Sequence, residues 1–175
     1  LIYLDLRSNE QMRSPPVAIC NEGAAMVRAY LQRFRRGAST DTVELQFMKF
    51  DYIPVSTFEL TNLKILDLSN NKFKDLPSEL IVFRVLEKLV LDDNLFELVP
   101  VSVKMLTSLK TLSFARNFLT IFEYETLEML VNIENLCILE NSRTLLSPSR
   151  FIYKRELNFL MFWHSSLMDV QKSGI

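Results

Sequence analysis

The chain has 175 residues, of which 49% are hydrophobic and 23% charged, a balance that excludes intrinsic disorder and fibrous proteins. Its 20 Lys and Arg against 21 Asp and Glu leave a net charge of −1, which gives no global attraction to nucleic acids or to acidic membranes. We therefore expect a folded protein that does not bind nucleic acid.

An apolar template recurs along the chain, with apolar residues at its first, fourth and sixth positions. Successive later copies begin 23 or 24 residues apart, a period typical of stacked repeats. Apolar residues two apart share one face of a strand, so Leu66 and Leu68 are expected to face the core while Asp67 faces outward. The template therefore predicts a solenoid. Its six copies start at Leu1, Thr40, Leu63, Leu86, Leu109 and Ile133.

A helical pattern separates the first two copies. Apolar residues recur there at steps of three and four, Pro15 and Pro16 precede them, and Gly37 is placed to end the helix. This predicts a linker helix over 17–37. A similar arrangement after the last copy predicts a second helix over 147–170, which either caps the solenoid or packs on a further module.

The first of these helical segments contains a run of arginines. Cations in the last turn of a helix interact favourably with its macrodipole, and we favour this explanation over a patch for a membrane or an acidic partner. The run consists of Arg28, Arg33, Arg35 and Arg36.

The ninth position of the template is asparagine in most copies, at the point where the chain leaves the strand. Its side-chain amide can satisfy backbone groups that the turn would leave unpaired, so the asparagines should stack as a ladder. Met48 takes this position in the copy starting at Thr40, which should be the loosest copy or should bury the Met. The asparagines are Asn9, Asn71, Asn94, Asn117 and Asn141.

The copies between residues 40 and 141 resemble the leucine-rich repeat family, whose unit reads LxxLxLxxNxLxxLPxxL. The clearest copy has Leu63, Leu66, Leu68, Asn71, Phe73, Leu76, Pro77 and Leu80. The resemblance implies an α/β fold, a curved solenoid with short parallel strands on its concave face and a flanking helix after the first and last repeats. The segment 14–31 is similar to a linker helix of some intracellular members of this family, through Pro15-Pro16, Ile19, Gly23, Val27 and Tyr30-Leu31.

We interpret the whole chain, 1–175, as a single solenoid fragment with further repeats or domains expected at both ends of a longer protein. Its expected parts are the end of one repeat block at 1–16, the linker helix at 17–37, a continuous repeat block at 40–146, and the second linker or capping helix at 147–170.

The outward residues of the strands form the candidate binding surface. Acidic residues outnumber basic ones there by six to three, which favours a moderately basic protein partner. Phe47, Ile65 and Val90 are the stronger individual candidates, because an outward apolar side chain can supply a desolvated anchor. Ser69 and Ala115 are expected on the same surface. The predicted partner contacts are Glu44, Phe47, Ile65, Asp67, Lys88, Val90, Asp92, Thr111, Ser113 and Arg116.

No residue pattern indicates catalysis, a cofactor or a metal. The three glycines are isolated, and no nucleophile elbow, zinc-protease or kinase signature is present. Cys20, Cys137 and His164 lack the spacing of a zinc site, and the adjacent carboxylates Asp92 and Asp93 are interpreted as surface charge because no third ligand is evident. We therefore predict that the chain is not an enzyme and needs no cofactor.

Cysteine clusters and glycosylation sequons are both absent from the sequence, which favours a reducing compartment, the cytoplasm. The longest apolar run, 157–163, is too short to cross a bilayer, which needs about 20 residues. The leading functional hypothesis is a non-catalytic protein-binding module, a scaffold or signal-transduction component that uses its concave face. The alternatives are a regulatory arm of a larger signalling enzyme, such as a kinase, GTPase or ubiquitin ligase, and a structural spacer.

Overall fold

The computed structural model describes residues 14–141, 145–146 and 158–159. The predictions for the copy starting at Leu1, including Asn9, lie outside these residues. So does most of the second helix predicted over 147–170.

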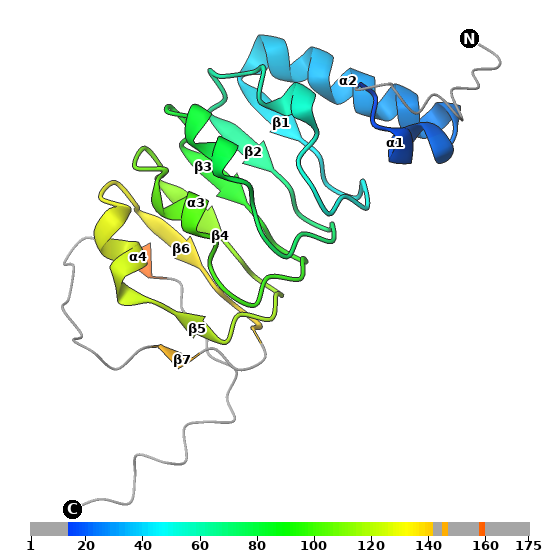
Figure 1. Cartoon of the computed structure of the whole chain (residues 1–175). Helices are drawn as coiled ribbons and strands as arrows, with labels where there is room; N and C mark the ends of the chain where they lie inside the picture. Colours follow the sequence, from blue (N-terminus) through cyan, green and yellow to red (C-terminus); the bar gives the residue numbers. More distant parts are fainter. Residues whose placement is uncertain (1–13, 142–144, 147–157, 160–175) are drawn as a thin grey trace, which may run out of the picture.

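Short parallel strands recur at the predicted template positions and pair side by side (Figure 1). Leu66 pairs in register with Leu89, and Leu89 with Leu112, each 23 residues further along the chain. Leu112 pairs with Leu136, which is 24 residues further. The predicted solenoid of short parallel strands is therefore confirmed. The main sheet contains β1 (Thr42–Glu44), β2 (Ile65–Asp67), β3 (Lys88–Val90), β4 (Thr111–Ser113), β6 (Asn135–Cys137) and β8 (Asn158–Phe159), and a second sheet pairs β5 (Ile121–Phe122) with β7 (Leu145–Leu146).

Short helical turns return the chain from one strand to the start of the next (Figure 1). Three of the four follow a proline, whose fixed φ suits the start of a helical turn and whose missing N–H is no loss there. The LP and VP pairs of the template thus have a structural role. These turns are η1 (Val55–Thr57), η2 (Ser78–Val82), α3 (Val101–Lys104) and α4 (Tyr124–Met129).

The core runs along the inside of the solenoid. Each repeat forms one coil of it, made of a strand and the segment that returns the chain to the next strand. Leu66 and Leu68 are fully buried as predicted, and so are their equivalents in the next two coils, Leu89, Leu91, Leu112 and Phe114. Phe73 and Phe96 form part of a row of buried phenylalanines two residues after the asparagine position, and the Phe96 ring meets Phe114 edge-on at 5.3 Å. Each coil therefore buries its apolar residues against its neighbours.

The prediction of one helix ending at Gly37 is wrong. The structure has two helices, α1 (Val17–Asn21) and α2 (Ala24–Thr40), with Gly23 between them at a φ of 95° that interrupts helical geometry. Gly37 lies inside α2, where a Cβ would come within 2.5 Å of the Val43 side chain. This glycine permits close packing on β1 instead of ending the helix.

Helix α2 covers the end of the sheet beside β1 (Figure 1). Val27 and Tyr30 on its inner face are buried, and the Tyr30 hydroxyl lies 2.6 Å from Ser56 Oγ beyond the first strand. Among the described residues, β1 is the first strand of the sheet, so α2 covers its outer edge.

At the other end, β8 falls within the segment predicted as a second helix. Asn158 pairs with Asn135 and Phe159 with Leu136, so these two residues continue the parallel sheet. A helix over 147–170 is therefore wrong for 158–159, where strand pairing with the preceding coil replaces it.

Candidate protein-binding surface

The predicted asparagine ladder is present in four consecutive coils. Asn94 Nδ2 donates to the carbonyls of Leu68 and Leu91, at 3.0 and 3.1 Å, and its Oδ1 accepts the N–H of Phe73 at 3.0 Å. Each amide thus joins its own coil to the preceding one and satisfies buried backbone groups of both. Asn71, Asn117 and Asn141 make the equivalent bonds.

Met48, which replaces asparagine in the first described coil, is buried with 4% of its surface exposed. Asn71 in the next coil compensates for the missing amide. Its Oδ1 accepts two N–H groups, from Met48 at 3.2 Å and Phe50 at 3.0 Å, and its Nδ2 donates to Leu45 at 2.9 Å. The Oδ1 of each ladder asparagine accepts from the coil before it. The described segment before the β1 coil is helix α2, which packs on β1, so no amide is needed at position 48.

The residue before the asparagine position has a left-handed backbone in every described coil. This conformation reverses the chain as it leaves the strand and usually favours glycine, asparagine or aspartate. Asn70 and Asp93 are of the favoured types, but Phe47, Arg116 and Glu140 are not, so the sequence does not mark the position in every coil. The residues and their φ values are Phe47 at 61°, Asn70 at 55°, Asp93 at 54°, Arg116 at 53° and Glu140 at 54°.

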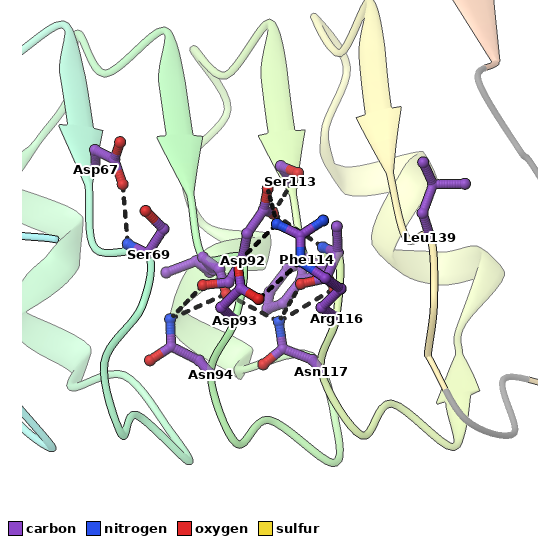
Figure 2. Close-up of polar contacts among 12 residues, drawn as sticks. Asp67, Ser69, Asp92, Asp93, Asn94, Ser113, Phe114, Arg116, Asn117 and Leu139 are labelled. Carbon is purple, nitrogen blue, oxygen red and sulfur yellow. Dashed lines mark hydrogen bonds and ion pairs between the residues drawn. The ribbon is translucent and has the colours of Figure 1, made fainter. Parts of the chain in front are cut away.

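Arg116 and two aspartates form a cross-coil cluster just beyond β3 and β4 (Figure 2). Arg116 donates to both oxygens of Asp93, from Nε at 2.7 Å and from Nη2 at 2.6 Å. Asp92 accepts from the hydroxyl of Ser113 and from the N–H of Ala115 at 2.9 Å. The interpretation of Asp92 and Asp93 as plain surface charge is therefore corrected, because both carboxylates link neighbouring coils.

This cluster explains the titration of its members. Hydrogen bonds from Arg116 lower the pKa of Asp93 below its ordinary value. The same pairing with Asp93 raises the pKa of Arg116 further above its usual range. Both groups stay charged, and the two charges neutralise each other within the ion pair.

Other positions expected on the surface lie elsewhere. Ser69 and Ala115 are buried, with 8% and 2% of their surface exposed, because the chain turns inward after the strand. Asp67 Oδ1 accepts the N–H of Ser69 at 2.9 Å and so supports this turn. The sequence predicts the turn at the asparagine, whereas the chain already turns inward two residues before it.

The remaining predicted contacts lie on the outward face of β1 to β4, except Phe47, which lies in the turn that follows β1. The register sets Ile65 beside Lys88 and Lys88 beside Thr111, and it sets Val90 next to Asp67. Ile65 and Val90 are half-buried, and Phe47 is 64% exposed. Glu44, Lys88 and Thr111 complete this group, which we call the strand-face patch: Glu44, Phe47, Ile65, Lys88, Val90 and Thr111.

One arginine of the run in α2 lies near this patch, a position that the sequence pattern does not indicate. Arg33 of α2 donates to the carbonyl of Gln46 at 2.6 Å. Its guanidinium lies in the field of Glu44 and Asp67, although desolvation has the larger effect and lowers its pKa. The acidic end of the strand face is therefore partly neutralised by α2, an arrangement that depends on contacts between distant residues.

Over residues 14–141 and the two short strands beyond them, no three His, Cys, Asp or Glu side chains are grouped so that they could hold a metal ion. In the same part of the chain, no helix has the length and apolar character required to cross a membrane.

Comparison with known proteins identifies related repeats. The family profile described as Leucine Rich Repeat matches residues 62–82. A Drosophila melanogaster leucine-rich repeat and calponin homology domain-containing protein is 46% identical over 52 residues, 30% of this chain and 6% of that protein. The Oryza sativa subsp. japonica plant intracellular Ras-group-related LRR protein 7 is 35% identical over 72 residues, 41% of this chain and 28% of that protein. The chain thus spans less than a third of either curated relative.

Two solved structures are also similar. The LRR ectodomain of the receptor kinase SOBIR1 from Arabidopsis thaliana aligns with a TM-score of 0.41 and 22% identity, over 54% of this chain and 53% of that one. The Leptospira interrogans LRR protein LIC12759 aligns with a TM-score of 0.41 and 26% identity, over 57% of this chain and 30% of that one.

Proposed function

Because the chain belongs to the leucine-rich repeat family, we propose that it is a non-catalytic module that binds a protein partner on its concave strand face. Domains of this family are commonly protein interaction modules, and the extended face of a solenoid is the usual contact surface. The partner surface would be the strand-face patch, with Asp67, Asp92, Ser113 and Arg116 supporting its geometry.

The observation that carries this proposal is the exposure of apolar side chains at the patch. Phe47 is 64% exposed, and Ile65 and Val90 are half-buried on a face whose other residues are polar. Leaving such groups in contact with water is unfavourable, and a partner that covers them gains the free energy of their burial. Arg116 and Asp93 neutralise each other, so this part of the face contributes little net charge.

The charged residues of the strand face that are not neutralised determine which partner would bind. Glu44 and Asp67 lie at the β1–β2 end, where Arg33 offsets part of their charge, and Lys88 lies on β3. A moderately basic partner would place its cations at the β1–β2 end and its acidic groups near Lys88. A cytoplasmic location fits this role, since the rice relative is named as intracellular.

The test compares a patch variant with a variant on the far side of the coils. Phe47→Asp combined with Val90→Asp should abolish capture of a partner that the unaltered chain enriches from a cell extract. Val101→Asp adds one charge on α3, where Val101 is 74% exposed, and should leave capture intact. Capture by the patch variant at the wild-type level, with its circular dichroism spectrum unchanged, would overturn the proposal in favour of a structural spacer.

A second candidate is a regulatory arm of a larger signalling enzyme. It is favoured by the small share of each curated relative that the chain covers, 6% and 28%. Determining the complete coding sequence tests it: a catalytic domain in the same polypeptide would support this function, and further repeats alone would count against it.

A further inference from the structure

The arginines of α2 do not occupy the end of the helix. The helix runs on to Thr40 and has no basic residue in its last turn. The interpretation of the arginine run as a stabiliser of the helix end is therefore wrong, and these side chains need another explanation.

Charge is strongly segregated in this molecule. Helix α2 contains four arginines and no acidic residue, so its charge of +4 within a chain of net charge −1 leaves −5 for all other residues. Arg33 turns toward the solenoid and binds Gln46. The other three, Arg28, Arg35 and Arg36, are exposed and form no ion pair with any described residue.

The exposed arginines lie along one side of the helix. Arg28, Gln32 and Arg35 follow each other at steps of four and three residues, which places them in one row. Seven residues of helix separate Arg28 from Arg35 by about 10 Å, or two turns. Leu31, 47% exposed, lies beside this row, so the face combines three cations, an amide and one apolar contact.

We propose that this face, made of Arg28, Leu31, Gln32, Arg35 and Arg36, docks an acidic helical segment of a protein partner. A helix with carboxylates at steps of three and four residues has the same two-turn spacing as the arginines, and guanidinium groups bind carboxylates through two parallel hydrogen bonds. The site lies on α2, apart from the strand-face patch, and does not depend on the function proposed for that patch.

The surroundings of α2 favour a compact acidic segment over an extended polyanion. Leu31 is the one large apolar residue that is exposed on the described part of this helix, which is too little for insertion into a bilayer. A membrane surface or a long nucleic acid would also extend over the remaining residues, whose charge of −5 would repel it. A short acidic helix contacts α2 alone.

The experiment measures binding of a synthetic helical peptide, labelled for fluorescence anisotropy, with Glu at positions i, i+4 and i+7. The variant changes Arg28, Arg35 and Arg36 together to Gln. The control variant changes three exposed cations outside α2, Lys72, Lys74 and Arg84, to Gln, and so removes the same net charge. We expect the α2 variant to lose affinity about tenfold or more, the control to change it less than about twofold, and binding to weaken from low to high salt.

Three results would overturn the proposal. They are no measurable binding of the peptide to the unaltered chain, equal losses in the α2 and control variants, and tighter binding to phosphatidylserine vesicles or to a single-stranded oligonucleotide than to the peptide. The Phe47→Asp, Val90→Asp variant should retain peptide binding, so failure at the strand-face patch and failure at α2 are distinguishable. Thermal unfolding of each variant confirms that the fold is intact.

Discussion

Arg116 binds Asp93, 23 residues earlier, through two charge-assisted hydrogen bonds that join the coil of β4 to the coil of β3. The pair is partly exposed, so solvent screens it and it contributes at most about 1 kcal/mol to stability. Its geometry nevertheless holds two residues with left-handed backbones in adjacent turns.

Arg116→Gln should lower the free energy of unfolding at neutral pH by about 1 kcal/mol or less. Because pairing lowers the pKa of Asp93 below 3.8, its contribution is present above the unfolded pKa and is lost as pH falls through the folded value. Urea unfolding at several pH values should show the difference between the two proteins disappearing as the pH falls through the folded pKa of Asp93. Lys72→Gln, an exposed cation, serves as control, and a difference that persists in acid would contradict the assignment.

Removal of a ladder amide should be far more costly. Asn94→Ala leaves buried carbonyls and the N–H of Phe73 without their partner, and we expect a loss of about 2–4 kcal/mol in urea unfolding. Asn71→Ala should cost at least as much, because Asn71 serves two N–H groups of the preceding coil.

The matched control for the ladder is Asn132→Ala. Asn132 also donates to a carbonyl of the preceding coil, Thr107 at 2.8 Å, but this bond is exposed to water. The control should cost less than about 1 kcal/mol. A loss equal to that of Asn94→Ala would show that burial does not set the energy of these amides.

Two buried threonines offer a gain in stability. Thr57 and Thr126 take the positions that Leu80 and Val103 hold in the central coils, and neither hydroxyl has a partner in the described structure. Thr57→Val and Thr126→Val keep the shape and remove the unpaired group, so each should raise the free energy of unfolding by about 1 kcal/mol. Thr120→Val, at an exposed site, should change it little, and destabilisation by the buried substitutions would contradict the assignment.

Gly37→Ala should destabilise the chain although alanine is the better helix former. Its Cβ would lie 2.5 Å from the Val43 methyl and 3.2 Å from the Thr42 carbonyl, and overpacking of about 1–3 kcal/mol outweighs about 1 kcal/mol of helix propensity. Val43→Ala removes the nearest atom. A double-mutant cycle by thermal unfolding should show that Gly37→Ala costs less in the Val43→Ala background, and additive effects would contradict the packing argument.

The strands and the asparagine ladder could be predicted because both follow from the spacing of residues within one repeat. The spacing of Leu66 and Leu68 predicted the strands, and the recurrence of Asn71 and Asn94 predicted the ladder, because each coil repeats the same local requirement. The helix break at Gly23 was not predicted, since it depends on the φ of that residue, and the role of Gly37 was predicted wrongly, since it depends on Val43 approaching from a different element.

The candidate site was harder to predict for the same reason. Arg116 and Asp93 share a cluster only after the coils are stacked in register, and Arg33 reaches the strand face only because α2 packs on β1. Alternation along a strand places Ile65 and Val90 correctly, but it does not show which charged neighbours are already paired.

The ladder gives the solenoid a polarity in the way it would come apart. The Oδ1 of each asparagine accepts from the coil before it, so loss of Asn117 leaves the N–H of Phe96 unpaired, whereas loss of Asn71 leaves the acceptor of Asn94 unchanged. Unravelling from the later coils therefore leaves backbone groups of the remaining coil without their amide partner, whereas unravelling from the earlier coils leaves the asparagine side chain of the remaining coil without its backbone partners. At the opposite end of the described residues, helix α2 packs on β1, and the Met48 N–H of that coil donates to Asn71 in the next coil.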